Sequence, residues 1–323
     1  MILNKQNNMK IVFLDAATLG DTSLEPIASL GELVCYPVST PEESMQRVAD
    51  AEVLIINKIV VNKQLLDAAP KLRLICEAAT GVNNIDLEEA AARGIPVRNV
   101  AAYSTDSVAQ LTWAHILSLA GDTPYFDACV KDGRYSRSGI FTDATVTWHE
   151  LAGKRLGVIG MGAIGSKVAA IGRAFGMDVV YFSTSGTSHC TEYPSLPLAE
   201  LLSSSDVVTV HAPMNERTRG LIGAAELALM KPSAFIANAG RGGIVDEAAL
   251  AAAVDAGVIA GAALDVYTRE PLPEDSPLLA VHHKERLRFT PHTAWASAEA
   301  RTRLVAAIAD NIRKTLPEAV RKA

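Results

Sequence analysis

The chain has 323 residues, of which 49% are hydrophobic and 20% charged, and a formal net charge of −6. This length accommodates one large or two ordinary domains. The acidic balance gives no support for nucleic acid or an acidic membrane as a partner, and no apolar run is long enough to span a bilayer. The N-terminal segment MILNKQNNMK lacks the apolar core of a signal peptide, so we expect residues 1–8 to be an extension before a strand that begins at Met9.

The first hundred residues alternate between short apolar runs and polar, alanine-rich stretches. The apolar runs are KIVFLD, LVCYP, VLIIN, LRLICEAA and IPVRNV. Strands that alternate with short helices indicate βαβ units and a parallel sheet. The segment GVNNID, which follows LRLICEAAT, has the Gly/Asn composition of a tight loop at the carboxyl end of a strand.

A long helix is predicted next, over the segment STDSVAQLTWAHILSLA. Its apolar residues cover most of the circumference, which predicts burial between larger bodies. These residues are Val108, Leu111, Trp113, Ile116, Leu117 and Leu119. The region around residues 122–150 has little periodicity, and we therefore expect an irregular arm or linker there.

From Lys154 onward, strand-like runs and helical pieces alternate again. The runs are RLGVIG, DVVYFS, DVVTVHAP, AFIANAG, AGAALDV and RLRFTPH, and a final helix is predicted over SAEARTRLVAAIADNIRKTL. This pattern predicts an α/β fold with two doubly wound domains. One domain comprises residues 105–292. The other comprises residues 1–104 together with 293–323, so that the last helix packs back on it.

The segment RLGVIGMGAIGSKVAA contains Gly160-x-Gly162-x-x-Gly165 between a strand and a helix, and a second strand follows within about thirty residues. Gly160 permits a tight turn, Gly162 lets a pyrophosphate approach the backbone, and Gly165 lets helix and strand pack closely. The helix N-terminus offers free N–H groups to phosphate. The pattern predicts a dinucleotide site, with glycines that serve only close packing as the alternative.

The end of the second strand in such a site carries an Asp or Glu that binds the adenosine ribose 2′-OH. Ser183 stands at that place here and is followed by Thr184 and Ser185. No carboxylate is there to repel a 2′-phosphate, and no arginine is adjacent to attract one. Because the hydroxyls can bond either form, the cofactor is predicted to be NAD or NADP, with the preference open.

Polar residues stand at or just after strand ends at three further places in the second half. They are Arg241 in NAGRGG, Asp265 and Glu270 in DVYTREP, and His292 in TPHTAW. Because the carboxyl ends of the strands face the ligand crevice in a doubly wound sheet, these residues are expected to converge at the nicotinamide end. Taken singly, Arg241 can be a surface ion-pair partner, Glu270 a turn acid and His292 a helix cap.

The order of GMGAIG, HAPMNERT, NAGRGGIVDE, GAALDVYTREP and TPHTAW resembles the D-isomer-specific 2-hydroxyacid dehydrogenase family over essentially the whole chain. The segments ATGVNNID and AYSTDSVAQ are similar to its glycerate dehydrogenase (hydroxypyruvate reductase) branch. The resemblance implies a flavodoxin-like substrate domain and a Rossmann dinucleotide-binding domain. It also implies reversible, NAD(P)-dependent reduction of a small 2-keto acid, such as hydroxypyruvate or glyoxylate, to the D-2-hydroxy acid.

The resemblance implies catalytic roles for three residues, and each role suits the side chain. The planar guanidinium of Arg241 stays charged and can hold carboxylate and keto oxygens. The imidazole of His292 can act as the acid/base group. Glu270 would hydrogen-bond His292, so that a proton is ready for the keto oxygen. Family members that oxidise formate carry an amide at this position, so Glu270 favours a hydroxy-acid/keto-acid couple.

The resemblance further implies contacts with cofactor and substrate. Besides the three glycines, Ser183 and Thr184, the cofactor contacts are Ala163, Ile164, Ala212, Pro213, Thr218, Ala239 and Asp265, with Ser107 as a further candidate. The substrate contacts are the backbone N–H groups of Thr80, Gly81 and Val82, with Asn57 and Lys58 as wall residues. Family members pair through the region around residues 122–150, which implies a homodimer.

A second function class remains open, a non-catalytic dinucleotide-sensing protein, because some relatives of this fold act as transcriptional corepressors. The intact set of arginine, glutamate and histidine favours an enzyme. The four cysteines lie far apart and form no CxxC pair, which predicts free thiols in a reducing cytoplasm. The remaining histidines, among them His211, His282 and His283, lack ligand-like spacing, so no metal is expected.

Overall fold

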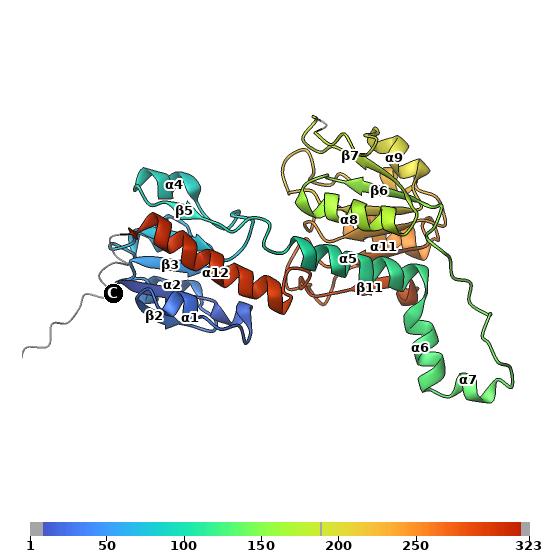
Figure 1. Ribbon diagram of the computed structural model, residues 1–323, viewed down its shortest axis with the longest axis horizontal. Helices are drawn as coiled ribbons and strands as arrows, with labels where there is room; N and C mark the ends of the chain where they lie inside the picture. The colour runs from blue at the N-terminus through green and yellow to red at the C-terminus, as the bar shows by residue number, and fades with distance from the viewer. Residues whose placement is uncertain (1–8, 188, 318–323) are drawn as a thin grey trace, which may run out of the picture. The chain divides into compact units, whose positions relative to one another are not determined.

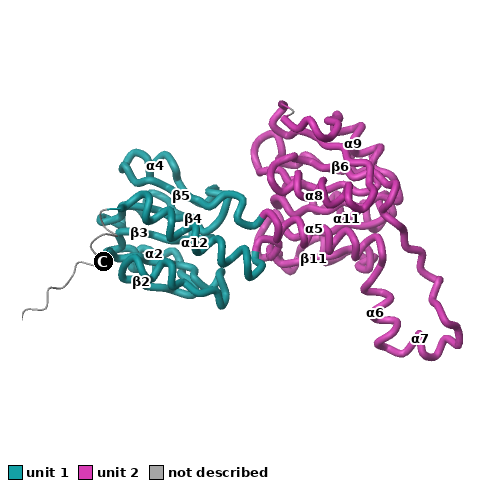
Figure 2. The backbone as a smooth tube through the Cα atoms, viewed as in Figure 1, with its two compact units in different colours: residues 1–104, 296–323 teal, residues 105–295 magenta. Residues whose placement is uncertain are grey.

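The computed structural model describes residues 9–187 and 189–317. The chain divides into two compact units (Figure 2). The first comprises Met1–Ser104 and Ala296–Ala323, and the second comprises Thr105–Trp295. The expected N-terminal extension, residues 1–8, lies outside the described residues.

The first unit contains a five-stranded parallel sheet (Figure 1). Its strands are β1 (Lys10–Phe13), β2 (Glu32–Cys35), β3 (Val53–Ile56), β4 (Leu74–Glu77) and β5 (Val97–Arg98), in the order β2-β1-β3-β4-β5. Every residue of β3 and β4 is buried, as expected for central strands of a parallel sheet. This strand order is that of the flavodoxin-like fold, which confirms the predicted fold class for this unit.

Short helices connect these strands, and local sequence determines where they begin. They are η1 (Ala16–Leu19), α1 (Glu25–Ala28), α2 (Pro41–Arg47), α3 (Lys63–Asp67) and α4 (Leu87–Ala92). Thr40 and Glu43 form a capping box at α2, and the side chains of Asn62 and Asp86 cap α3 and α4. The last helix, α12 (Ala298–Thr315), packs against α1 and β4 within the same unit.

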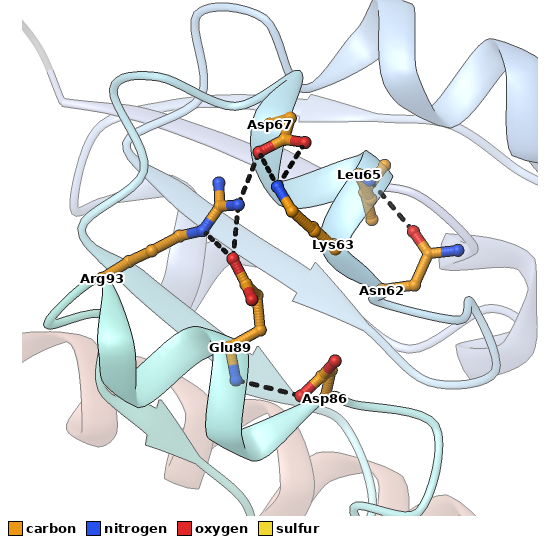
Figure 3. Close-up of polar contacts among 7 residues, drawn as sticks. All are labelled: Asn62, Lys63, Leu65, Asp67, Asp86, Glu89 and Arg93. Atoms are coloured by element: carbon orange, nitrogen blue, oxygen red, sulfur yellow. Dashed lines mark hydrogen bonds and ion pairs between the residues drawn. The ribbon is translucent and has the colours of Figure 1, made fainter.

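An ion cluster joins α3 to α4, which begins directly after the loop at residues 78–86 (Figure 3). Arg93 Nη2 lies 2.5 Å from Asp67 Oδ1 and 2.6 Å from Glu89 Oε1. Lys63 Nζ pairs with the same Asp67 at 2.9 Å. Since these groups are partly or largely exposed, the cluster orients the two helices but adds little to the free energy of unfolding.

The second unit contains a six-stranded parallel sheet. Its strands are β6 (Arg155–Ile159), β7 (Asp178–Phe182), β8 (Val207–Val210), β9 (Phe235–Asn238), β10 (Gly261–Leu264) and β11 (Leu287–Phe289), in the order β11-β10-β9-β8-β6-β7. Ser195 adds a single parallel bridge to Tyr181 on the outer side of β7. With that reduced strand counted, the order is the Rossmann order 3-2-1-4-5-6, and the predicted fold class is confirmed here too.

The helices of the second unit include α8 (Ala163–Ala174), α9 (Leu198–Ser204), α10 (Ala224–Leu227), α11 (Glu247–Asp255) and η2 (Lys284–Arg286). The long predicted helix is α5 (Thr105–Ala120), which packs on α8 and on β9, β10 and β11. Its Trp113 is buried, donates from Nε1 to the Val168 carbonyl and stacks on Phe175. The burial predicted for Leu117 is wrong, because this side chain is 41% exposed.

An arm extends from the second unit (Figure 1). The prediction of an irregular arm around residues 122–150 is wrong for its first part, which forms α6 (Thr123–Lys131) and α7 (Arg134–Arg137). Large apolar side chains are exposed along the arm, namely Val130, Tyr135, Ile140, Phe141 and Trp148. Among the helices of the described residues, none is both long and apolar enough to cross a membrane.

Candidate active site

The predicted glycine turn connects β6 to the N-terminus of α8. Gly160 has a φ of 92°, and a Cβ added to it would lie 3.0 Å from Ala212 N. A Cβ on Gly165 would overlap the Gly160 carbonyl, whereas nothing lies within 4 Å of a Cβ on Gly162. The turn therefore leaves open space over Gly162, beside the first amides of a 12-residue helix. These amides, including those of Ala163 and Ile164, suit a pyrophosphate.

A hollow of about 310 Å³ lies at this end of the sheet. Of the predicted cofactor contacts, it is lined by Gly160, Gly162, Ser183, Thr184 and Pro213. It is also lined by His211, whose two ring nitrogens have no hydrogen-bond partner within the described chain. Burial lowers the pKa of His211 to about 4, so its imidazole is neutral. Buried polar atoms without a partner suit a bound ligand, a feature that sequence reasoning missed.

No arginine is adjacent to Ser183 in the sequence, but the fold brings one to the segment that follows it. Arg217 follows β8, far from β7 in sequence, but its Nη1 donates to the Ser185 carbonyl at 2.8 Å. No pattern in the sequence brings these two loops together. The structure therefore places a cation beside Ser185, a residue that lines the hollow.

Thr218, one of the predicted cofactor contacts, makes its hydrogen bonds within the loop after β8. Thr218 is fully buried, and its hydroxyl donates to the Pro213 carbonyl at 2.6 Å and accepts from Asn215 N at 2.9 Å. These bonds fix the turn that follows Ala212, which is itself buried. Thr218 therefore shapes the loop.

Arg241 lies on the loop after β9, which follows Ala239. Its Nη1 donates to the Gly240 carbonyl at 2.8 Å, and no carboxylate in the described parts of the chain forms an ion pair with its half-buried guanidinium. Asn238 Nδ2 donates a hydrogen bond to the Arg241 carbonyl at 2.9 Å. Gly242 lies so close to Tyr267 that a Cβ would overlap the Tyr267 carbonyl. The loop with Arg241 is thus in backbone contact with the loop after β10.

Glu270 and His292 form a direct pair. His292 Nδ1 lies 2.6 Å from Glu270 Oε2, and Glu270 Oε1 accepts from Tyr267 N at 2.9 Å. Because an ionised carboxylate only accepts hydrogen bonds, Nδ1 carries the proton and Nε2 is left for chemistry. Glu270 belongs to the loop after β10, which touches the Arg241 loop, and His292 belongs to the loop after β11, so the structure brings the three predicted residues to neighbouring strand ends.

Asp265 holds the loop that carries His292. Its carboxylate is buried and accepts from the Thr290 hydroxyl at 2.6 Å, from Thr293 N at 2.8 Å and from Ala294 N at 3.0 Å. His292, between these attachment points, has a φ of 51°. The structure gives Asp265 this positioning contact, which the sequence did not reveal; its implied contact with the nicotinamide stays a prediction.

Two residues of α5 reach the same loop. His115 Nε2 lies 3.0 Å from the Thr290 hydroxyl, and Ser107 Oγ donates to the Ala294 carbonyl at 2.5 Å. The Thr290 hydroxyl donates its one hydrogen bond to Asp265, so it can only accept a hydrogen bond from His115. Nε2 of His115 therefore carries a proton. Burial lowers the pKa of His115, which keeps the imidazole neutral. His115 is therefore a structural residue, while Ser107 anchors the loop.

The predicted substrate residues lie in the first unit, at the carboxyl ends of β3 and β4. Within residues 9–187 and 189–317, the backbone amides of Thr80, Gly81 and Val82 donate no hydrogen bond. The backbone amides of Asn57 and Lys58 both donate to the Asp15 carboxylate, at 3.0 and 2.6 Å. The structure thus leaves the amides of residues 80–82 free for an acceptor, while those of residues 57 and 58 are used.

A buried carboxyl pair lies beneath these loops. Glu77, at the end of β4, is fully buried; its Oε2 accepts from Asn84 Nδ2 at 3.0 Å, and its Oε1 has no hydrogen-bond partner among the described residues. Burial, together with the nearby Asp15 and against the hydrogen bond from Asn84, raises the pKa of Glu77 to about 8. Burial also raises the pKa of Asp15. Asn84 Nδ2 also donates to the Ile59 carbonyl at 2.9 Å. This one side chain therefore links the loop after β4 to the loop after β3.

Known proteins resemble the chain over nearly its whole length. Residues 113–294 match the family described as "D-isomer specific 2-hydroxyacid dehydrogenase, NAD binding domain". Glyoxylate reductase of Aeropyrum pernix is 40% identical over 281 residues, covering 83% of this chain and 80% of that protein. Glycerate dehydrogenase of Methylorubrum extorquens is 36% identical over 307 residues, covering 94% and 95%. The structure of NADPH-dependent glyoxylate/hydroxypyruvate reductase from Sinorhizobium meliloti is similar with a TM-score of 0.81, at 27% identity and 94% coverage of both chains.

Proposed function

Because the chain belongs to the D-isomer-specific 2-hydroxyacid dehydrogenase family, we propose that it reduces a small 2-keto acid of the hydroxypyruvate or glyoxylate type to the D-2-hydroxy acid, reversibly. Family membership confirms the predicted enzyme class and the nicotinamide dinucleotide cofactor. It also favours an enzyme over the dinucleotide-sensing alternative.

One observation carries the proposal. A histidine–carboxylate pair at 2.6 Å and an arginine without a carboxylate partner in the described chain lie on loops that touch through Gly242 and Tyr267. A 2-keto acid needs both groups, because it presents a carboxylate beside a carbonyl that becomes an alkoxide. A sensing protein has no use for a positioned proton donor.

The proton step uses His292. Its Nδ1 is held by the Glu270 carboxylate, so Nε2 gives a proton to the keto oxygen during reduction and takes it back during oxidation. Glu270 stabilises the charged imidazolium when His292 is protonated. A nicotinamide dinucleotide, when bound, would supply the hydride for the carbonyl carbon. Asp265 keeps the backbone on both sides of His292 in place while the proton moves.

Arg241 holds the substrate. Its guanidinium can donate to one carboxylate oxygen and to the keto oxygen at once, which fixes the carbonyl for attack. In the first unit, the amides of Thr80, Gly81 and Val82, which no acceptor of the described chain occupies, stay proposed substrate contacts, and Asn57 and Lys58 stay proposed wall residues. In this assignment the first unit binds substrate and the second binds cofactor.

A panel of initial rates tests the proposal. Hydroxypyruvate, glyoxylate, pyruvate and bulkier keto acids are mixed with each reduced coenzyme, and nicotinamide absorbance is followed. We expect turnover with the smaller acids, and His292→Ala should lower kcat by about 10²–10⁴ because the acid/base group is lost. His282→Ala is the matched control, since His282 is exposed and pairs only with Asp255 in the described chain. Absence of turnover with every acid, or a fully active His292→Ala variant, contradicts the proposal.

We also propose that the protein is a cytoplasmic homodimer that pairs through the arm. The support is the set of apolar side chains exposed there, with Phe141 91% and Trp148 56% exposed. Contiguous exposed apolar surface is unfavourable on a monomer and marks a surface for association.

A further inference from the structure

We propose that the preferred coenzyme is NADP(H) and that Arg217 binds its 2′-phosphate, an inference that rests on the proposed function. The sequence leaves the choice between NAD and NADP open, because the end of β7 offers only hydroxyls. The structure adds a cation at that place from a different loop. Arg217 is thereby a residue that determines coenzyme specificity.

The position of the β7 end relative to the glycine turn locates the ribose. Gly160 N donates to the Phe182 carbonyl at 3.0 Å, so the residues that follow Phe182 lie beside the turn. Ser183 and Thr184 line the same hollow as Gly160 and Gly162. A dinucleotide whose pyrophosphate lies over Gly162 therefore places its adenosine ribose against Ser183, where NAD-specific sites carry an acidic residue.

The guanidinium of Arg217 lies against this segment. Its Nη1 donates to the Ser185 carbonyl at 2.8 Å and would be 3.1 Å from a Cβ on Gly186. No carboxylate of the described chain forms an ion pair with Arg217, whose side chain is exposed. Its remaining N–H donors and its full charge are thus available to an anion at the ribose.

Hydroxyl groups converge beside the guanidinium. Ser183 Oγ and Ser185 Oγ lie 3.1 Å apart, and both donate to the Thr187 carbonyl, at 2.7 and 2.9 Å. No Asp or Glu is among the residues that line the hollow. A 2′-phosphate carries close to two negative charges and accepts several hydrogen bonds, so it gains from the charge and free N–H donors of Arg217. The two serine hydroxyls can donate to it only by turning away from the Thr187 carbonyl. A neutral ribose hydroxyl gains much less from the charge than a phosphate does.

Binding of adenosine fragments tests the inference without any turnover. Isothermal titration compares 2′,5′-ADP with 5′-AMP on the whole protein. We expect 2′,5′-ADP to bind at least about tenfold more tightly, and Arg217→Gln to remove most of that difference while leaving 5′-AMP binding unchanged. Arg219→Gln is the matched control, because Arg219 is an exposed arginine two residues away with no contact to the 183–187 segment in the described chain. Equal binding of the two fragments, or an Arg217→Gln variant that keeps the difference, overturns the inference.

A second variant tests the same point from the opposite direction. Ser183→Asp introduces the carboxylate that repels a 2′-phosphate, and it should lower the preference for 2′,5′-ADP over 5′-AMP, measured as the ratio of their dissociation constants, at least about tenfold. An unchanged ratio also overturns the inference. The outcome is separable from the proposed function. Selective 2′,5′-ADP binding without reduction of any keto acid refutes only the function, whereas equal turnover with NADH and NADPH, independent of Arg217, refutes only the coenzyme preference.

Discussion

His292 has a backbone φ of 51°, in the left-handed region that a non-glycine residue keeps only when its surroundings hold it there. Asp265 supplies that hold, because it accepts hydrogen bonds from Thr290 before His292 and from Thr293 and Ala294 after it. Glu270 then fixes the imidazole through Nδ1. The family motif identifies His292 and Glu270 from sequence, but the anchoring of the loop depends on contacts that no local pattern encodes.

Arg217 illustrates the same limit of sequence reasoning. Ser183 is found from its spacing after the glycine turn, because that spacing is set by one βαβ unit. Arg217 belongs to a loop after another strand, and only the sheet order places that loop beside Ser185. Residues that reach a site from a distant loop are invisible to spacing arguments.

Glu77 leads to a prediction for stability against pH. Burial raises the pKa of Glu77 to about 8 in the folded protein, from 4.5. Between these values the folded protein keeps a proton that the unfolded chain releases, so the contribution of Glu77 to the free energy of unfolding falls as pH rises through this window. Glu77→Gln removes the titration, and the free energy of unfolding of the variant should fall less between about pH 5 and pH 8, by at least about 1 kcal/mol.

Urea unfolding at several pH values measures this difference. Glu88→Gln is the control, since Glu88 is an exposed glutamate of the same unit, and it should follow the wild-type pH dependence. Parallel curves for the wild type and Glu77→Gln would show that Glu77 is ionised in the folded protein across the range.

At the scale of elements, glycines let strand ends approach each other. A Cβ on Gly160 would lie 3.0 Å from the end of β8, and one on Gly240 would lie 3.1 Å from the Ala212 carbonyl. Gly242 lies against the loop after β10. These contacts gather the carboxyl ends of β6, β8, β9 and β10 into one site. The sequence predicts the strands and the glycines, although not which loops the glycines bring together.

Two elements differ from the expectation for physical reasons. In α6, the apolar residues Tyr125, Phe126, Cys129 and Val130 follow helical spacing. The helix is short, and the polar residues after Lys131 weaken the helical periodicity when the whole region is considered. The third Rossmann strand is reduced to one bridge at Ser195, so it has no strand-length apolar run to detect. Short elements that depend on tertiary contacts are the part of this fold that periodicity does not reveal.

At the scale of the whole molecule, the two sheets follow from alternation of strand and helix, which is a long-range and redundant pattern. Pairing of two molecules leaves a weaker trace in the sequence, because exposure of an apolar side chain is not visible there. Phe141 and Ile140 are 91% and 60% exposed, and no pattern in the region distinguishes them from buried residues.

Pairing through the arm predicts the effect of a charge on it. Phe141→Asp places a carboxylate in the proposed interface, so the variant should dissociate to monomers at micromolar concentration, because an unpaired buried charge is strongly unfavourable. Sedimentation velocity measures the change. Val38→Asp serves as the control, since Val38 is 73% exposed in the first unit, and it should sediment like the wild type. A wild type that is monomeric, or a Phe141→Asp variant that stays dimeric, contradicts pairing through the arm.

We propose that Arg241 and His292 act on one small anion. A crystal structure of the protein with coenzyme and oxamate, a nonreactive analogue of a 2-keto acid, tests it most directly. We predict that the oxamate carboxylate lies within hydrogen-bond distance of the Arg241 guanidinium and that its carbonyl oxygen faces Nε2 of His292. Oxamate bound away from both side chains, or held by Arg241 with His292 turned elsewhere, would contradict the claim.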